Sequence, residues 1–265
     1  MARGLRHLAV ELFRRRDLLY LVTWRDIKLK YKQSVMGFLW AVLMPLVIVS
    51  AGLIVRFGFG KLSGTPLKLD DLILVTVKAA PWAFFVSGIR FASNSLIANA
   101  NLVTKIYMPR EIFPIASVLS QLMDFAVASA VVVVMLAIAG VPLRLELLWI
   151  VPLLLLLVLL TTALGVFLSA AALFFRDVKY IVEVILTFAI FFTPVFYEVA
   201  LFGRWQTLLL LNPVSPLLEG LAAAATGRAM PAPIWLGYSA IFSIGGCLAS
   251  LAFFKKLEPY FAESV

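Results

Sequence analysis

Four charged residues interrupt the long apolar stretches of this sequence: Lys78, Arg90, Asp124 and Glu183. A charge inside a membrane-spanning helix is costly, so each is a candidate for lining a transport pathway, with a purely structural role as the alternative. Lys78 lies near one end of its stretch, and we expect it to snorkel toward the membrane surface. The sequence has no pair of acidic residues near the middle of a stretch, which argues against a proton-coupled transporter.

The sequence offers few of the side chains that catalysis or metal binding requires. One Cys and one His exclude an internal disulfide and leave most metal sites without ligands. The phosphate-binding pattern G-x-x-x-x-G-K-[ST] is absent, because its nearest fragment, Gly60-Lys61, has Val55 in place of the first Gly and Leu62 in place of Ser or Thr. We therefore predict no catalytic residue, no metal site and no cofactor in this chain. Any ATP, with its Mg²⁺, is expected on a separate subunit.

Hydropathy divides the chain into segments that are long enough to cross a bilayer. Charged residues make up 14% of the sequence, well below the roughly 25% of a soluble domain, and the mean hydropathy is +1.03. A transmembrane helix needs about 20 apolar residues. We therefore predict an all-α integral membrane protein, one domain over 1–265, with six transmembrane helices at 35–57, 72–97, 113–139, 147–175, 180–199 and 234–254.

The basic residues predict how these spans are oriented. An even number of spans places both termini on one side, and that side holds 15 Lys and Arg against 6 on the other. Cytoplasmic loops are enriched in Lys and Arg. Both termini are therefore predicted to be cytoplasmic.

The segment before the first span is predicted to form an amphipathic helix at 10–32 on the cytoplasmic membrane surface. Four residues recur at helical spacing and form one stripe: Tyr20, Trp24, Ile27 and Tyr31. Aromatic side chains favour the headgroup zone, and the nine Lys and Arg of residues 1–33 suit anionic lipids. No motif that recognises nucleic acid accompanies these charges, so we expect no nucleic-acid partner. A helix that only packs on the spans is a compatible alternative.

Two loops are expected to contain short helices. Residues 200–230 are apolar but broken by Pro and Gly, which favours two short re-entrant helices over a full span. Asn212-Pro213 predicts the turn between them, and both residues, with Pro216, are candidates for an outer gate. The loop 99–112 lies on the predicted cytoplasmic side, and its polar side chains are available to a protein partner there.

Two segments carry longer patterns. Residues 99–114 read N-A-N-L-V-T-K-I-Y-M-P-R-E-I-F-P, and residues 25–40 read R-D-I-K-L-K-Y-K-Q-S-V-M-G-F-L-W. Both resemble the matching segments of the type-2 ABC exporter permeases that move cell-surface polysaccharides, above all those for O-antigen and teichoic acid. Shorter matches follow in the same order at Arg176-Asp177-Val178, Thr193-Pro194-Val195 and Asn212-Pro213. Lys78 departs from the family, in which a small or apolar residue is usual there.

The resemblance implies a function and a set of partners. A polysaccharide on a polyprenyl diphosphate lipid would cross the bacterial cytoplasmic (inner) membrane through a homodimer of this chain, among membrane lipids, with two copies of an ABC ATPase. The matching loop is the coupling helix of the family, and its candidate contacts to the ATPase are Lys105, Tyr107, Arg110 and Glu111. Candidates for guiding the lipid diphosphate or holding the interface helix are Arg14, Arg15, Arg16, Trp24, Lys28 and Tyr31.

Three other interpretations stay open. An ABC permease for a small hydrophobic drug or haem would share the fold. An integral membrane enzyme acting on lipid-linked sugars would need a carboxylate cluster at the membrane surface, but the one adjacent acidic pair, Asp70-Asp71, is predicted on the outer side, away from nucleotide sugars. A structural membrane subunit without transport activity is the third.

Overall fold

The computed structural model describes residues 15–32, 39–63, 69–105, 108–142 and 144–261, and these residues contain helices, turns and loops but no strand. In chain order the α-helices are α2 (Arg16–Lys32), α3 (Leu39–Ser63), α4 (Leu69–Ser93), α5 (Ser95–Ala98), α6 (Ala100–Lys105), α7 (Ile112–Ile138), α8 (Ile150–Phe174), α9 (Val178–Ala189), α10 (Gln206–Leu210), α11 (Val214–Thr226) and α12 (Pro233–Leu257). Short 3-10 helices are η1 (Leu145–Trp149), η2 (Val199–Trp205) and η3 (Glu258–Tyr260).

Within the described part of the chain, four helical segments are long and apolar enough to cross a membrane: Leu72–Ser93, Ile112–Ile138, Leu145–Phe174 and Pro233–Tyr260. The shortest has 22 residues, about 33 Å of helix, which matches a hydrocarbon layer of about 30 Å. These segments occupy the places where the sequence predicts the second, third, fourth and sixth spans. Helix α3, with 25 residues, begins four residues after the expected start of the first span at 35 and continues past its expected end at 57. A total of six spans stays a prediction.

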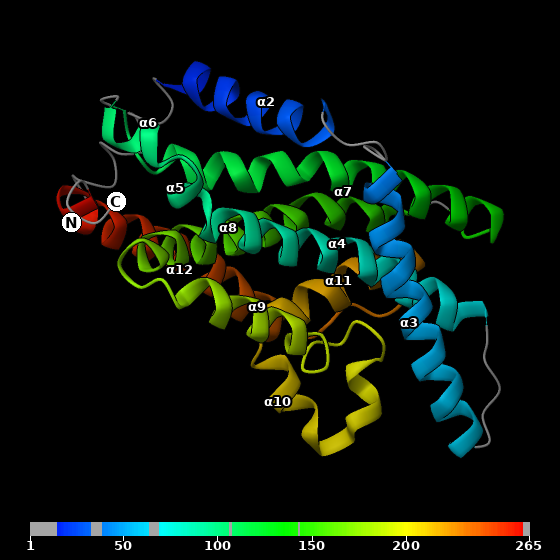
Figure 1. Ribbon diagram of the computed structural model, residues 1–265. Coiled ribbons are helices and arrows are strands. Elements are labelled where there is room, and N and C mark those ends of the chain that lie inside the picture. Colours follow the sequence, from blue (N-terminus) through cyan, green and yellow to red (C-terminus); the bar gives the residue numbers. More distant parts are fainter. Residues whose placement is uncertain (1–14, 33–38, 64–68, 106–107, 143, 262–265) are drawn as a thin grey trace.

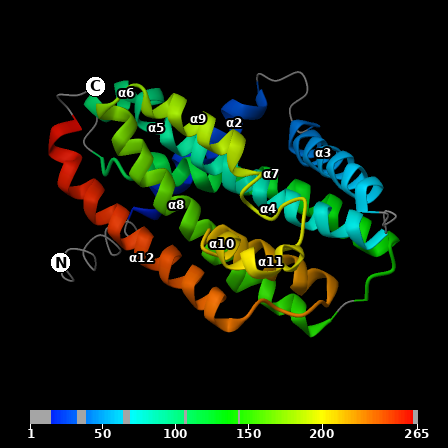
Figure 2. The ribbon, with the colours of Figure 1, turned by 90° about the horizontal axis from the view of Figure 1, so that it is seen from below.

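Helix α4 lies at the centre of the bundle (Figure 1). Its apolar window is 78% buried, whereas the other three span-length segments are 11–28% buried. Helix α4 packs against α7 and α8, and α12 packs against α8. Seen from below, α12 and α3 lie on opposite sides of this group (Figure 2).

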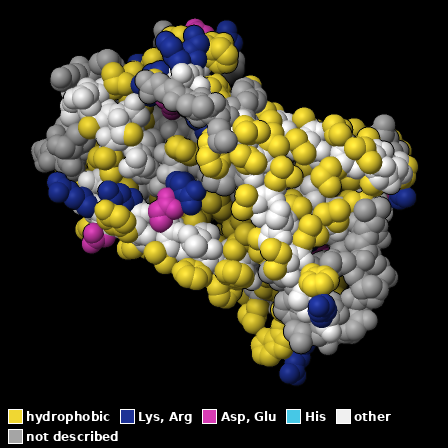
Figure 3. All heavy atoms as spheres, turned by 45° about the vertical axis from the view of Figure 1, so that its right-hand side comes forward, with side chains coloured by type: hydrophobic (Ala, Val, Ile, Leu, Met, Phe, Trp, Pro, Cys, Tyr) yellow, Lys and Arg dark blue, Asp and Glu magenta, His cyan; other side chains and the backbone are white. Residues whose placement is uncertain are grey.

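The surface of the bundle is apolar. Figure 3 shows a face covered mostly by hydrophobic side chains, with Lys and Arg gathered at its rims. Large side chains such as Ile138 and Ile241 are 82% and 73% exposed. A water-soluble protein rarely exposes apolar area this extensive, whereas lipid tails are a suitable environment for it.

The two ends of the bundle hold different elements (Figure 1). We call the end that carries α5, α6 and η3 the terminal end, because the last described residues lie there. The opposite half, with η1 and α11, is the distal half. Helix α11 stops at Gly227, whose φ of 71° is a left-handed conformation that Gly adopts without strain. The side chain of Arg144 donates to the Gly227 carbonyl at 3.4 Å.

The helix expected over 180–199 is shorter in the structure. Helix α9 has 12 residues and ends at Ala189, after which turns run to Tyr197. The Thr193 hydroxyl donates to the Ala189 carbonyl at 2.8 Å, and Pro194 has no N–H with which to continue the helix. Twelve residues reach about 18 Å, so α9 by itself does not cross a hydrocarbon layer of about 30 Å.

The expected interface helix and re-entrant region both contain helices. Helix α2 covers the described part of 10–32, since residues 10–14 lie outside it, and α2 packs along α7. In the region 200–230, α10 and α11 are separate helices whose break lies at Asn212-Pro213, where the sequence predicts a turn. Pro216 falls in the first turn of α11, where no helical N–H bond is lost. The position of either region in a membrane stays a prediction.

Candidate transport pathway

Two cavities adjoin the central helix α4, and Trp82 lines both of them. The larger, about 810 Å³, is lined almost entirely by apolar side chains of α4, α8, α9 and α12. The smaller, about 430 Å³, is bordered by α2, α3, α4, α7 and α9 and contains charged side chains. We call the first the apolar groove and the second the polar cleft.

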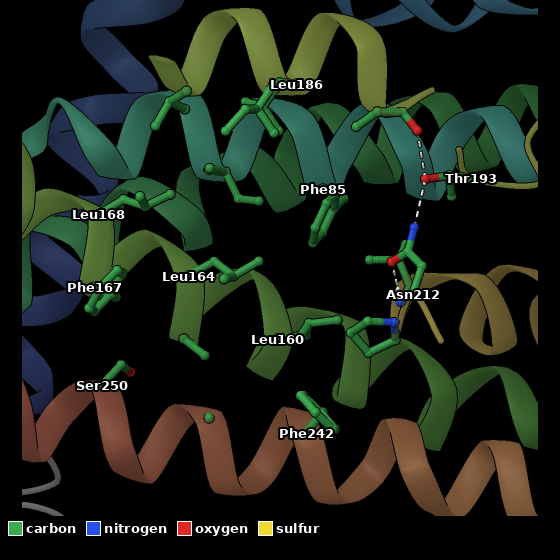
Figure 4. A pocket seen from close by; sticks show the side chains of 18 of the residues that line it. Phe85, Leu160, Leu164, Phe167, Leu168, Leu186, Thr193, Asn212, Phe242 and Ser250 are labelled. Carbon is green, nitrogen blue, oxygen red and sulfur yellow. Dashed lines mark hydrogen bonds between the residues drawn. The ribbon is translucent and has the colours of Figure 1, made fainter. Parts of the chain in front are cut away.

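The apolar groove lies between α9 and α12 (Figure 4). Phe85, Phe167 and Phe242 point into it, and Asn212 and Thr193 lie at one end. The Asn212 amide donates to the Thr193 hydroxyl at 2.9 Å, and its carbonyl oxygen accepts the N–H of Val214, at the start of α11, at 3.1 Å. These bonds fix the turn between α10 and α11 at the end of the groove. Asn212 and Pro213, two of the three predicted gate residues, therefore line this cavity.

The polar cleft contains two cations, each paired with a carboxylate. Arg90 donates to both Glu183 oxygens, at 2.7 and 3.0 Å, and so joins α4 to α9. Lys30 of α2 pairs with Asp124 of α7 and lies 5.1 Å from the centre of the Phe91 ring. Aromatic side chains form much of the remaining wall: Trp40, Trp82, Phe84, Phe91 and Phe125. Three of the four intramembrane charges noted in the sequence thus meet at or beside one cleft.

Lys78, the fourth charge, does not snorkel. Its side chain is 1% exposed and contacts the carboxylate of Glu219 on α11 at 2.8 Å. The expectation of a lysine reaching the membrane surface was wrong because a carboxylate inside the protein satisfies the ammonium group. Nothing in the local sequence around Lys78 indicated this partner, which lies 141 residues away.

Those residues expected to guide a lipid diphosphate that the structure describes are spread along α2. Arg14 lies outside the described residues, and Arg15 and Arg16 are at the start of the helix. Tyr31, 15 residues after Arg16 and thus about 22 Å away along the axis, donates to Asp124. Burial, with a smaller effect from Asp124, raises the pKa of Tyr31 above its ordinary value, so the phenol keeps its proton.

Trp24 and Lys28 lie on the outer side of α2. Trp24 is 44% exposed and stacks on Tyr20 with the ring centres 6.4 Å apart. The Lys28 ammonium lies 5.6 Å from the centre of the Trp24 ring. An exposed aromatic pair beside a cation suits a headgroup zone, and this part of the expectation stays a prediction.

The predicted coupling loop is tied to the last described residues of the chain. The Lys105 side chain and Tyr107 lie outside the described part of the structure. Arg110 donates from its side chain to the carbonyl of Glu258 at 2.6 Å. Glu111, the residue before α7, is 1% exposed and pairs with Lys255 of α12 at 2.9 Å. A carboxylate buried in this way is not on the surface for a partner protein, which leaves Arg110 as the more accessible of the two.

Lys255 contacts a second carboxylate, that of Glu258, also at 2.9 Å. Burial raises the pKa of Glu111 above its ordinary value, and Lys255 acts in the opposite direction. Lys255 and Glu258 were missed by the sequence reasoning, because the long chain between them and the loop hides the contact.

Comparison with known proteins decides the family. The model of the ABC-2 type transporter family matches residues 17–225. The chain belongs to the ABC-2 type transporter family. The resemblance inferred from its motifs is confirmed, and the protein is a multi-pass membrane subunit of a transporter rather than an enzyme.

Two ABC-2 relatives align with nearly the whole chain. The O-antigen export system permease protein RfbA of Klebsiella pneumoniae is 28% identical over 252 residues, which cover 93% of this chain and 94% of the relative. RfbA of Myxococcus xanthus is 27% identical over 263 residues, which cover 96% and 98%. Each alignment therefore covers more than nine-tenths of this ABC-2 subunit.

Proposed function

We propose that this chain is the permease subunit of an exporter that carries a polyprenyl-diphosphate-linked polysaccharide, of O-antigen or teichoic-acid type, across the bacterial cytoplasmic membrane. Two copies of the chain form the pathway, and two copies of a separate ABC ATPase bind ATP and Mg²⁺. The observation that carries this proposal is the end-to-end match to permeases named for O-antigen export. The absence of a phosphate-binding loop from the sequence supports a separate ATPase.

The two cavities suit a cargo with a charged head and a hydrocarbon tail. Arg90 and Lys30 in the polar cleft are donors for phosphate, and the aromatic walls offer flat surfaces for sugar rings. The neighbouring apolar groove offers hydrocarbon-like surface beside the same helix. Each cation already pairs with a carboxylate, so a diphosphate would have to compete with Glu183 and Asp124 for them.

Export of a small hydrophobic drug or haem is the second candidate. The apolar groove favours it, since about 810 Å³ lies within the usual 300–1,000 Å³ of a small-molecule pocket. A deletion strain distinguishes the two cargos. Polymer retained on its lipid carrier inside the cell, and restored to the surface by the wild-type gene, supports glycan export. Normal surface polymer together with sensitivity to a drug or to haem favours the second candidate.

Arg90→Gln tests the polar cleft within the same strain. We expect lower polymer export at normal protein amount, because the variant removes a cation from the cleft. Arg204→Gln, a change of the same type at an exposed arginine of η2, is the matched control and should export like the wild type. If both variants export as much polymer as the wild type, Arg90 has no role in the transport pathway.

Orientation is tested separately with reporter fusions. Both termini and the terminal end are proposed to be cytoplasmic, so fusions at Lys105 and Lys179 should report the cytoplasm. Fusions at Lys61 and Arg144 should report the outer side. A cytoplasmic signal at Arg144 would contradict this map.

A further inference from the structure

Three parts of the chain meet at one charged pair in the distal half. The Lys78 ammonium, on α4, donates to Glu219 Oε1 of α11 at 2.8 Å and to the Tyr197 carbonyl at 3.0 Å. The same Glu219 oxygen accepts the N–H of Val199 at 3.1 Å. One carboxylate oxygen therefore joins the central helix to α11 and to the start of η2.

The segment held by this pair is packed closely on all sides. Val195 is 1% exposed, and Phe196 lies against Gly52 of α3, where an added Cβ would come within 2.7 Å of the Phe196 ring. On α11, Leu217 and Leu218 are fully buried. The segment 195–199 therefore contacts α3 through Phe196, while α11 packs against α4 and α8.

A buried ion pair fixes the relative position of the elements that it joins but adds little to the stability of the fold. Taking two charges out of water costs much of what their attraction returns, so an apolar pair of similar volume would give comparable stability. The pair differs from apolar residues in one respect. It supplies an acceptor for the Val199 N–H, which as the first N–H of η2 has no partner within that helix, and a donor for the carbonyl of Tyr197, which lies in the turn before η2.

We infer that Lys78 and Glu219 are the positioning residues of a distal closure formed by α11 and the segment 195–199. Movement of α11 withdraws Glu219 from both Lys78 and Val199, so α11 and the segment are released together. This role rests on the proposed function in one respect, namely that the distal end is the exit side of an export pathway. The pair itself is defined by contacts that need no cargo.

A cysteine reporter tests the closure directly. Cys247 is the single cysteine of the chain, so Cys247→Ala/Val195→Cys places one thiol at a buried position of the segment. The protein is purified in phosphatidylethanolamine–phosphatidylglycerol nanodiscs, where both faces are accessible, and the rate of labelling by a charged maleimide is measured. We expect slow labelling, because Val195 is enclosed.

Lys78→Met/Glu219→Leu in this background removes both charges at once, so neither is left unpaired. We expect labelling about tenfold faster, because the segment 197–199 loses two hydrogen bonds. Val199→Pro is a milder second variant that removes one donor and leaves the ion pair intact. Proline is compatible there, since Val199 is the first residue of η2 and Glu198 before it is extended (φ −96°, ψ 138°). It should speed labelling about threefold.

The matched control is a more solvent-accessible ion pair of the same segment, Arg228–Glu198, whose side chains are 38% and 30% exposed and 2.8 Å apart. Arg228→Gln/Glu198→Gln should change the rate less than twofold, because exposed pairs contribute little. Unchanged labelling in both Lys78→Met/Glu219→Leu and Val199→Pro would overturn the inference. The assay contains no cargo and no ATPase, so a failure of the proposed glycan export leaves its result intact.

Discussion

At the distal end, Lys78 is 1% exposed and contacts the carboxylate of Glu219, whereas at the terminal end Lys255 is 28% exposed and contacts the carboxylates of Glu111 and Glu258. Both lysines join a helix to a neighbouring non-helical segment. The two lysines differ in burial and in the arrangement of their acidic neighbours. Loss of one carboxylate leaves Lys255 paired with the other, whereas loss of Glu219 takes away the carboxylate that contacts a fully buried lysine, which also donates to the Tyr197 carbonyl.

This comparison suggests what each end is built for. The distal pair defines one arrangement of α4, α11 and the segment 195–199, because one Glu219 oxygen contacts both Lys78 and the Val199 N–H. The terminal cluster connects the predicted coupling loop to the end of α12, and its second carboxylate lets one contact change while the lysine keeps a partner. A loop that transmits movement benefits when its lysine can exchange one carboxylate contact for another. A closure benefits when its elements are held in a single defined position.

The largest effect is expected from Glu219→Leu, which removes the carboxylate that contacts the buried Lys78. Breaking a buried pair from one side costs about 3–5 kcal/mol. Unfolding of the purified protein in increasing SDS measures this loss. Lys78→Met/Glu219→Leu should recover most of it, because no unpaired charge remains. A double variant as unstable as Glu219→Leu would show that the stability loss does not come from the isolated charge.

At the terminal end, Lys255→Met should cost about 1.5–3 kcal/mol, the usual value for hydrogen bonds to charged groups. The loss is smaller than for Glu219→Leu because Glu258 is partly exposed and the buried Glu111, whose pKa is raised by burial, takes up a proton more readily than an ordinary carboxylate. Lys256→Met, next to it in the same helix, is the control and should lie within about 0.5 kcal/mol of the wild type. A loss from Lys255→Met as large as from Glu219→Leu would remove the contrast between the two ends.

An uncharged contact of the distal half should have an intermediate effect. Asn212→Ala removes the bond to Thr193 and the cap on the Val214 N–H. We expect a loss of about 1–2 kcal/mol. Asn212→Asp keeps an acceptor for the Val214 N–H but loses the amide donor to Thr193, so it separates the contribution of the cap from that of the bond to Thr193. Stability equal to the wild type in Asn212→Ala would mean that the turn is held by packing alone.

The smallest effect is expected from Glu111→Gln, less than about 1 kcal/mol near neutral pH, because Lys255 keeps Glu258 and the amide is an uncharged substitute. The sign of its pH dependence is informative. Burial raises the pKa of Glu111 in the folded protein above its ordinary 4.5, so the wild type loses stability as pH rises from 4.5 through the raised value. Melting curves from pH 4.5 upward should show this decline in the wild type and a weaker one in Glu111→Gln.

The sequence predicted the parts of the fold that depend on local signals. The span expected at 113–139 lies where the structure has α7 (Ile112–Ile138), since a long apolar run is recognisable without its neighbours. The break at Asn212-Pro213 is equally local. The end of α9 at Ala189 was not predicted, because the residues that follow are still apolar and the turn depends on bonds to Thr193 and Asn212.

The candidate site was predicted less completely than the fold. The charges of the polar cleft were noted, but their pairing across α2, α4, α7 and α9 depends on contacts between residues far apart in the chain. Glu111 was expected at the surface because the loop around it is polar, whereas it is buried and paired with Lys255 of α12. Lys78 was recognised as unusual. Its partner Glu219 could have been proposed from the sequence only by looking for an acidic residue in the other apolar regions.

The short α9 has a consequence for the bilayer itself. Its apolar outer face, with Val184 and Phe188 more than half exposed, is about 18 Å long, while the hydrocarbon of a typical membrane is about 30 Å thick. Hydrophobic mismatch of this kind is relieved when the bilayer thins beside the helix. The free-energy cost is a fraction of a kcal/mol for each ångström of mismatch. The membrane next to α9 is therefore expected to be thinner than elsewhere around the protein. A charged head group moving past Arg90 and Glu183 would have a shorter hydrocarbon barrier to cross.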